Sequence, residues 1–308
     1  MVAGQWSRRH LLQRSAMLAA AANAVRAPSA QAETNSIADP MKPVPIPAQH
    51  PAREGIAEIA GAKLSYWDTG GAGTPIMLMH PASSDASIWP YQQPVFAAAG
   101  YRVIAFSRRG YGKSSAVAAD NPGSASEDLH QLAAFLGLDR FHIVASADGC
   151  AFANDYALSH PEKVRAMVLT SGLGGGQDPD YLAITQALTP KGYSDLPVAF
   201  RELGPSYRAA NPEGVKAWSA LTEKAITGNR YGQSFVNIIN WASLGRMRVP
   251  VLLVTGDADL NAPPAIIRMF AARIPGAEMA LIPEAGHSSH WEQPQSFNRI
   301  VLDFIGRH

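Results

Sequence analysis

Two loops near the end of the chain carry residues that could do acid–base chemistry. Asp257 and Asp259 follow an apolar run at 251–255, and His287 follows another at 278–282. If both runs are parallel strands, their loops lie at the carboxyl edge of one sheet, where open α/β sheets bind ligands. A histidine oriented by a carboxylate can take a proton from a nucleophile and return it to a leaving group. The spacing therefore predicts a general base that needs a nucleophile on an earlier strand.

The predicted nucleophile position holds an alanine. An apolar run at 141–146 leads into the turn Ala145-Ser146-Ala147-Asp148-Gly149. The small residues two before and two after Ala147 resemble the nucleophile elbow of the α/β hydrolases, in which a strand and a helix approach each other closely around the central residue. The central residue, Ala147, has no oxygen and cannot attack a substrate.

The neighbours of Ala147 are poor substitutes for a nucleophile. Ser146 is one residue early, and adjacent side chains of a strand point to opposite faces. Asp148 is one residue late, where its backbone N–H is better placed than its carboxylate. Cys150 is expected to pack against the sheet. We therefore keep Ala147 as the nucleophile position.

The rest of the chain alternates short apolar runs with amphipathic segments. Strands are expected at 56–60, 63–69, 76–79, 102–106, 141–146, 164–170, 251–255 and 278–282. Helices are expected at 89–99, 126–136, 149–159, 266–274 and 294–305. This alternation predicts an α/β fold with a mostly parallel sheet covered by helices on both faces. The segment 173–248 has no strong strand but has helical stretches at 181–188, 198–203, 212–226 and 234–244, which predict a helical insertion.

Five motifs, taken in order, resemble those of the α/β-hydrolase family. They are His80-Pro81-Ala82 with Trp89, Arg108-Arg109-Gly110-Tyr111-Gly112-Lys113-Ser114, the join from Tyr156 to Val164, Gly256-Asp257-Ala258-Asp259, and Ala285-Gly286-His287 with Glu292-Gln293-Pro294. The resemblance covers residues 55–308 and implies the α/β-hydrolase fold, an eight-stranded, mostly parallel sheet with an inserted helical cap. It divides this part into a core at 55–172 and 249–308 and a cap at 173–248.

The resemblance also implies catalytic roles. His287 is the expected base and Asp259 the acid that orients it. Asp257, or an acid after the sixth strand such as Asp178, is the alternative to Asp259. His290 is the competing histidine, for which a helix-cap or supporting role is expected.

The loop after the run at 76–79 is the expected partner of the elbow. The backbone N–H groups of Ala82 and Asp148 would form an oxyanion hole. Pro81 stands where the family usually has glycine, and it has no N–H, which leaves the shape of this loop open. His80 is expected to brace the loop. Ser83 either points into the pocket or caps the following helix.

Aromatic residues are the expected walls of the pocket. Trp89, Trp218 and Trp241, together with Ser83, are predicted to contact the substrate. Each cap aromatic taken alone is better explained by packing within the cap, but together they favour a small apolar or aromatic substrate.

The expected activity is cleavage of a carboxylic ester or lactone through a Ser-His-Asp triad whose serine is replaced by Ala147. The intact acid and histidine loops favour a replaced serine over a chain that naturally lacks the nucleophile, because a protein freed from hydrolysis has no chemical reason to keep both. A binding protein or pseudoenzyme, and a C–C bond or epoxide hydrolase of the same fold, are the alternatives. The expected partner is a small-molecule substrate, and the sequence has no motif for a metal or a cofactor.

Residues 1–32 have the composition of an export signal. They contain four arginines and no acid. Arg8 and Arg9 precede a weakly apolar run at 16–25, which is followed by Ala30-Gln31-Ala32, a small-residue cleavage site. The paired arginines resemble the twin-arginine signal of bacteria, which predicts a periplasmic or secreted protein. Residues 33–54 form a proline-rich lead-in.

The composition bounds the remaining classes. A chain of 308 residues, 47% of them hydrophobic, can bury a sizeable core. A net charge of +1 gives no reason to expect nucleic acid or anionic lipid as a partner. A single cysteine excludes an intrachain disulfide. The mature part has no run suited to spanning a membrane, and the oligomeric state is left open.

Overall fold

The computed structural model describes residue 39 and residues 42–172, 175–227 and 232–308. The predicted export signal lies outside the described residues. Residues 43–52 of the lead-in have neither helix nor strand, and the first strand begins at Arg53, inside the predicted lead-in. No helix of the described residues is long and apolar enough to cross a bilayer.

An eight-stranded sheet lies at the centre, in the order β1-β2-β4-β3-β5-β6-β7-β8. The strands are β1 (Arg53–Ile59), β2 (Ala62–Asp68), β3 (Pro75–Met79), β4 (Arg102–Phe106), β5 (Phe141–Ser146), β6 (Val164–Thr170), β7 (Val251–Gly256) and β8 (Glu278–Ile282). The pairs β1–β2 and β2–β4 are antiparallel, and every pairing from β4 to β8 is parallel. The predicted mostly parallel sheet is confirmed.

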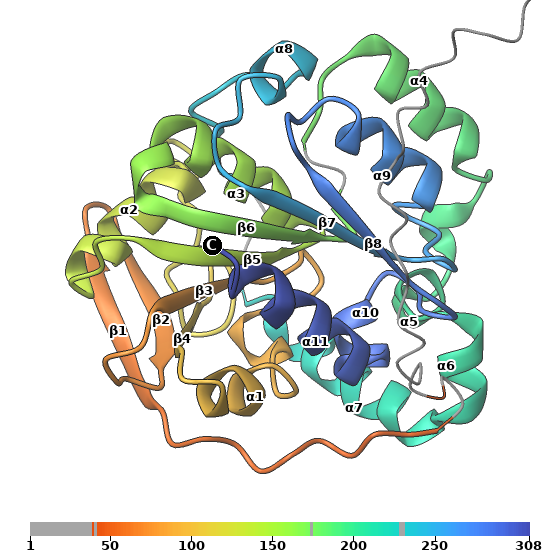
Figure 1. Ribbon diagram of the computed structural model, residues 1–308, viewed down its shortest axis with the longest axis horizontal. Helices are drawn as coiled ribbons and strands as arrows, with labels where there is room; N and C mark the ends of the chain where they lie inside the picture. Colours follow the sequence, from red (N-terminus) through yellow and green to blue (C-terminus); the bar gives the residue numbers. More distant parts are fainter. Residues whose placement is uncertain (1–38, 40–41, 173–174, 228–231) are drawn as a thin grey trace, which may run out of the picture. The chain divides into compact units, whose positions relative to one another are not determined.

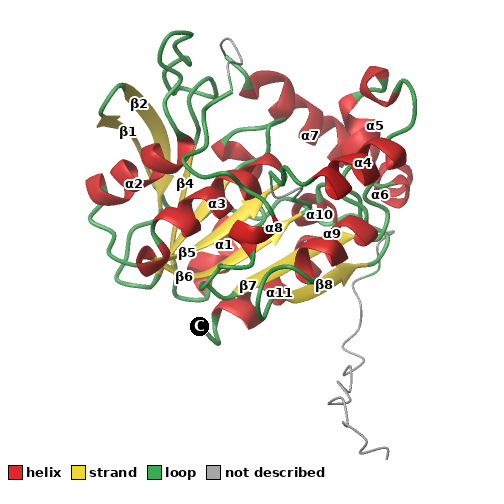
Figure 2. Ribbon diagram, turned by 90° about the horizontal axis from the view of Figure 1, so that it is seen from above, coloured by secondary structure: helices red, strands yellow, loops and turns green. Residues whose placement is uncertain are grey.

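Helices cover both faces of this sheet, and Figure 2 shows it as a twisted layer between them. On one face lie α1 (Gln93–Ala98) and α11 (Pro294–Ile305). On the other lie α2 (Ala125–Phe135), α3 (Asp148–Ser159) and α9 (Pro264–Ala271). Each face has its own apolar core, because the strands between them are apolar on both sides.

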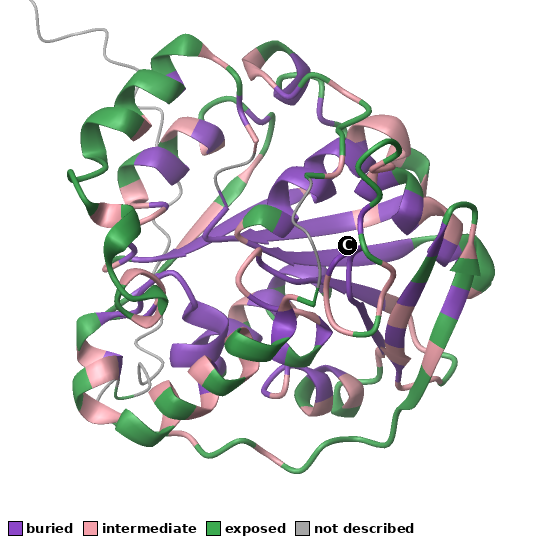
Figure 3. Cartoon of the chain, turned by 180° about the vertical axis from the view of Figure 1, so that it is seen from behind, coloured by how far each residue is buried: buried purple, intermediate pink, exposed green. Residues whose placement is uncertain are grey.

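The helix α11 illustrates how the sequence selects this packing. Its residues Phe297, Val301 and Phe304 are buried and lie four and three positions apart, which places them on one stripe facing the sheet. The central strands are buried along their length, whereas the outward faces of the surrounding helices are exposed (Figure 3).

Between β6 and β7 the described chain forms a helical insertion. It contains α4 (Pro179–Leu188), the 3-10 turn η3 (Tyr193–Asp195), α5 (Val198–Glu202), α6 (Pro205–Ala210), α7 (Pro212–Ala225) and α8 (Trp241–Leu244). Figure 1 shows α4, α5 and α6 beside the carboxyl ends of β7 and β8. The helical character of this segment agrees with the prediction, while the boundary at 173–248 remains a prediction.

Two predicted helices are shorter in the structure. Of the stretch 234–244, only α8 is helical, because the backbone N–H groups of Val236 and Asn237 donate to the carboxylate of Asp155 at 2.9 and 2.8 Å. Of the stretch 89–99, the α-helix begins only at Gln93, with Pro94 in its first turn. The helices α6 and α10 (Ser289–Glu292) were not predicted, and neither were the 3-10 turns η1 (Ala86–Ile88), η2 (Pro161–Lys163) and η3.

Candidate active site

Ala147 occupies a strained turn between β5 and α3. Its φ of 50° and ψ of −115° lie in a region that L-residues rarely adopt. Gly149 follows because a Cβ there would lie 2.7 Å from the carbonyl oxygen of Met79. The turn therefore has the geometry expected of a nucleophile elbow, with a methyl group where a nucleophile would stand.

Asp259 and His287 form a buried pair. Nδ1 of His287 lies 3.0 Å from both carboxylate oxygens of Asp259. The same carboxylate accepts the backbone N–H groups of Asn261 and Ala262, each at 2.8 Å, and the hydroxyl of Thr255 at 3.2 Å. With its proton on Nδ1 donated to Asp259, His287 has Nε2 left as the basic nitrogen.

The pair shifts both pKa values in opposite directions. Burial alone would raise the pKa of Asp259, but the charge and hydrogen bond of His287, with the two backbone N–H groups, outweigh it and lower the pKa. Burial alone would lower the pKa of His287, but the Asp259 carboxylate raises it, helped by the charges of Glu202 and Glu292. The histidine is therefore a stronger base than a free imidazole.

The alternative acids and the competing histidine lie in other contacts. Asp257 accepts the backbone N–H of Glu284 at 2.7 Å, and Asp178 accepts that of Trp241 at 2.7 Å. His290 is fully buried, and burial lowers its pKa to about 3. Neither of its ring nitrogens has a hydrogen-bond partner among the described residues, so His290 is not bonded to Asp259.

Ala82 and Asp148, the predicted oxyanion-hole donors, border the same cavity as Ala147 and His287. Asp148 is the first residue of α3, where a backbone N–H has no acceptor within the helix. Its carboxylate is held by Arg108 at 2.6 Å, which keeps it turned to that side chain. Arg108 thus supports the elbow from the neighbouring loop.

His80 braces the loop that carries Ala82. Its Nδ1 lies 2.8 Å from the carbonyl oxygen of Pro81, and its Nε2 accepts the backbone N–H of Arg108 at 3.0 Å. Burial, and then the charge of Arg108, hold its pKa well below the usual value, so the ring is neutral and can accept this bond. The His80 side chain therefore connects the backbone at Pro81 to the backbone at Arg108.

The cavity has a volume of about 430 Å³ and lies between the sheet edge and the insertion. Its lining combines charged, polar and aromatic side chains. The residues are Pro81, Ala82, Ser83, Ala147, Asp148, Ala151, Ser171, Gly175, Gly176, Gln177, Tyr181, Leu182, Arg201, Glu202, Phe235, Asn261 and His287. The structure thus places the predicted nucleophile position, the predicted base and the two predicted oxyanion-hole residues on one cavity.

The three tryptophans predicted to contact the substrate do not line this cavity. Trp89 is in the core, with its ring 4.8 Å from that of His290. Trp241 packs against Tyr181 and Phe270. Trp218 is buried and borders a neighbouring cavity. Aromatic side chains pack where they bury the most apolar area. The number of aromatic residues in a segment therefore does not predict whether they line a cavity or pack in the core.

Ser83 does line the cavity, and it reveals a residue that the sequence did not single out. Its hydroxyl donates to Oε2 of Glu202 at 2.7 Å. The carbonyl oxygen of Glu202 also accepts the backbone N–H of Ser288, the residue after His287, at 3.0 Å. Glu202 therefore joins the insertion to both catalytic loops. It lies in an ordinary helical stretch, and no motif marks it.

A second carboxylate, Glu292, belongs to the histidine-loop motif of the sequence, and the structure gives it a role that was not predicted: it holds the insertion to that loop. Its Oε2 accepts the backbone N–H groups of Gly204 at 2.8 Å and Gly286 at 3.0 Å. A Cβ at Gly286 would lie 2.4 Å from the nitrogen of Gly204, so only glycine allows this approach. Burial raises the pKa of Glu292 to about 7.

Other reactive groups are inert or absent from the described residues. Burial raises the pKa of the Cys150 thiol far above its usual value, and its Sγ lies 3.3 Å from the carbonyl oxygen of Ala145. Such a thiol is not a nucleophile at neutral pH. Among the described residues, no group of three or more His, Cys, Asp or Glu side chains is arranged to hold a metal ion.

The chain matches the alpha/beta hydrolase family over residues 76–300, and it belongs to that family. It is 28% identical over 272 residues to the 2-hydroxy-6-oxononadienedioate/2-hydroxy-6-oxononatrienedioate hydrolase of Cupriavidus pinatubonensis, covering 78% of this chain and 89% of that one. It is 25% identical to the 2-hydroxy-6-oxo-6-phenylhexa-2,4-dienoate hydrolase of Burkholderia cepacia, covering 76% and 88%. The structure of Est816, described as an N-acyl homoserine lactone degrading enzyme, has a TM-score of 0.64 and 25% identity, covering 81% of this chain and all of that one.

Replacing Glu202 by glutamine is expected to lower the pKa of His287, because it removes a negative charge that favours the imidazolium. Asp259→Asn should lower it further, since Asp259 supplies both the nearest charge and a hydrogen bond. The pKa is measured by following the His287 ring signals by NMR against pH. Glu127→Gln, on the exposed face of α2, is the control and should leave the midpoint in place. An unchanged midpoint in Glu202→Gln would show that this carboxylate does not act on the histidine.

Glu292 should make stability fall as pH rises. A folded-state pKa near 7, above the usual 4.5, means that the native chain binds more protons than the unfolded chain between these values. The free energy of unfolding of the parent relative to Glu292→Gln should therefore drop across this window, by up to about 1.4 kcal/mol per pH unit. Urea unfolding from pH 4.5 to 8 measures it, with Glu284→Gln on the same loop as the control. Parallel pH curves for the parent and Glu292→Gln would contradict the prediction.

Proposed function

We propose that the chain is the scaffold of a hydrolase for a small carboxylic ester or lactone, in which Ala147 stands where the working enzyme has serine. The observation that carries the proposal is that one cavity is bordered by the strained elbow at Ala147 and by His287, whose Nδ1 is bonded to the buried Asp259. Membership of the family and the likeness to Est816 support a hydrolytic activity.

The arrangement supports the following reaction in a chain with serine at the elbow. His287 removes the hydroxyl proton as the oxygen bonds to the substrate's carbonyl carbon. The charge that develops on the carbonyl oxygen faces the N–H groups of Ala82 and Asp148. The bond to the leaving oxygen breaks, and that oxygen takes the proton from His287. Water then repeats the sequence on the acyl group and releases the acid.

With Ala147 the first bond cannot form, so a bound substrate is held without acyl transfer. The cavity of about 430 Å³ suits a small organic molecule. Tyr181, Leu182 and Phe235 offer apolar contacts, and Arg201 offers a cation for a carboxylate or another anionic group.

Hydrolysis of a C–C bond beside a ketone is the second candidate. The relatives that favour it are named as dienedioate and phenylhexadienoate hydrolases, at 28% and 25% identity. This reaction uses the same base and oxyanion hole, but its leaving group is a carbon that needs a neighbouring unsaturated group to hold the electron pair. The guanidinium of Arg201 would suit the carboxylate of such a substrate.

Export is a separate proposal that rests on the sequence alone. Arg8 and Arg9, the apolar run and the small-residue site are the features that support it.

The variant Ala147→Ser is expected to hydrolyse chromogenic esters or lactones at least about 10³-fold faster than the parent chain, because it restores the attacking oxygen. An organophosphonate should label the variant at position 147 and leave the parent unlabelled. Adding Asp259→Asn to Ala147→Ser should abolish most of the gain. A diene ketone of the kind named for the relatives is assayed in parallel, and faster turnover of it would favour the second candidate. No turnover and no labelling with any substrate would overturn both and favour a binding protein.

Exchanging the arginine pair for lysines, Arg8→Lys with Arg9→Lys, is expected to prevent export from a bacterial host. The measurement is the fraction of the chain in the periplasm after fractionation. Arg14→Lys is the matched control and should leave export intact, because Arg14 lies outside the pair. Equal periplasmic fractions in the pair variant and the parent would overturn the twin-arginine assignment.

A further inference from the structure

The base His287 has an open nitrogen at the catalytic cavity. Its Nδ1 is bonded to Asp259, whereas its Nε2 has no hydrogen-bond partner among the described residues and is not one of their enclosed polar atoms. The ring therefore presents Nε2 to the cavity that it borders. A basic nitrogen in this position can remove a proton from an acidic group that reaches it.

The hydroxyl groups of the described lining are poorly placed to act as nucleophiles. They belong to Ser83, Ser171 and Tyr181. The Ser171 hydroxyl is enclosed by protein, so a substrate cannot reach it. Burial raises the pKa of Tyr181, which keeps its phenol protonated at neutral pH. The hydroxyl of Ser83 already donates to Oε2 of Glu202 at 2.7 Å. The base is therefore left with water as its proton donor.

The side chain of Ala147 leaves room for that water. Ala147 is partly exposed, and its side chain ends at a methyl group on the cavity. A serine at the elbow would carry one more heavy atom to the place from which a carbonyl carbon is attacked. A water molecule is about the size of that hydroxyl group, so it can take the same place beside the base.

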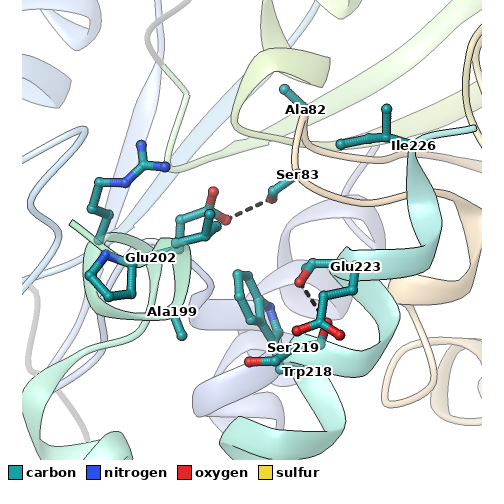
Figure 4. A pocket seen from close by; sticks show the side chains of 12 residues that line it. Ala82, Ser83, Ala199, Glu202, Trp218, Ser219, Glu223 and Ile226 are labelled. Atoms are coloured by element: carbon teal, nitrogen blue, oxygen red, sulfur yellow. Dashed lines mark hydrogen bonds between the residues drawn. The ribbon is translucent and has the colours of Figure 1, made fainter. Parts of the chain in front are cut away.

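Glu202 is a second group that can hold this water. Its Oε1 has no partner among the described residues and is not enclosed, while Oε2 accepts the Ser83 hydroxyl. Figure 4 shows this bond from the neighbouring cavity that Trp218 borders. The carbonyl oxygen of Glu202 accepts the N–H of Ser288 at 3.0 Å, which ties α5 to the histidine loop. A carboxylate there can accept one proton of a water whose other proton goes to His287.

We propose that the chain with Ala147 is itself a slow hydrolase, in which water attacks the ester or lactone directly. The inference rests on the proposed function, because it uses the same cavity, base and oxyanion hole.

The direct reaction has two steps. His287 takes one proton of the water through Nε2 as the water oxygen bonds to the carbonyl carbon, and Glu202 accepts a hydrogen bond from the other proton. The bond from that carbon to the leaving oxygen then breaks, and the leaving oxygen takes the proton from His287. The products are a carboxylic acid and an alcohol, and no bond to the protein forms at any step.

The test follows hydrolysis of a p-nitrophenyl ester by the parent chain. Saturation without a burst is expected, and an organophosphonate should leave the parent unlabelled. His287→Gln keeps an N–H donor for Asp259 but has no base, so it should lower kcat/KM about 10²-fold. His308→Ala is the matched control and should leave the rate unchanged, because this histidine is exposed and lies outside the cavity lining.

Glu202→Gln tests the second group with a readout that a purely structural role would not move. It should lower kcat/KM of the parent about tenfold, because the water loses an ionised acceptor. The rate should also rise at a lower pH than in the parent, since the lost charge no longer favours the imidazolium of His287. Glu213→Gln, at an exposed carboxylate of α7, is the control, and circular dichroism checks that each variant folds.

The outcomes separate this inference from the proposed function. If Ala147→Ser cleaves the ester and the parent is no faster than His287→Gln, direct attack by water is wrong and the proposed function stands. If the parent turns over through His287 but Ala147→Ser is neither faster nor labelled, direct attack stands and the proposal of a replaced serine fails.

Two further results would overturn parts of the assignment. Organophosphonate labelling of the parent at Ser83, or a burst that Ser83→Ala removes, would identify Ser83 as the nucleophile in place of water. A rate and a pH midpoint in Glu202→Gln equal to those of the parent would remove Glu202 from the reaction.

Discussion

The buried carboxylate of Asp259 is the constraint on which the site depends. Removing a charge from water is costly unless hydrogen bonds replace those of the solvent. Here the replacements come from Thr255 at the end of β7, from the N–H groups of Asn261 and Ala262, and from His287. Because these donors belong to the acid loop and the histidine loop, the two loops must keep one relative position. The same bonds that stabilise the carboxylate fix the tautomer of the base.

The elbow at Ala147 shows that its geometry is a property of the scaffold. A non-glycine residue at φ 50° is strained by about 1–3 kcal/mol. The strain is held by bonds on both sides, since Ala147 donates to Thr170 at 2.9 Å and accepts from Cys150 at 3.0 Å. Gly149 lets α3 approach β3. None of these contacts uses an oxygen on residue 147. The turn at Ala147 is therefore held entirely by contacts that need no side-chain oxygen at this position.

The sequence was sufficient where local pattern and chemistry coincide. Buried parallel strands are short apolar runs, so β4, β5 and β6 have the predicted bounds, and the edge strand β8 has them as well. The acid after β7 and the histidine after β8 could be paired from the order of their loops together with the resemblance to the family. Sequence patterns were insufficient where a contact with a residue far away in the chain decides the local structure or the role of a side chain. The stretch 234–240 is not helical because Asp155 binds its backbone, and the role of Glu202 depends on meeting Ser83, which lies 119 positions earlier. The tryptophans show the same limit, because packing against the sheet or within the insertion competes with lining a cavity.

The insertion affects the chemistry as well as the shape of the site. Through Glu202, α5 contributes negative charge near His287 and accepts a hydrogen bond from the loop that carries Ala82. Through Gly204, the chain after α5 is bound to Glu292, which also binds the backbone before His287. A displacement of α5 would therefore change three things together: the charge that supports the base, the hydrogen bond to the loop that carries Ala82 and the support of the histidine loop. In this fold the basicity of His287 and the position of the loop that carries Ala82 are consequently set by the same few contacts.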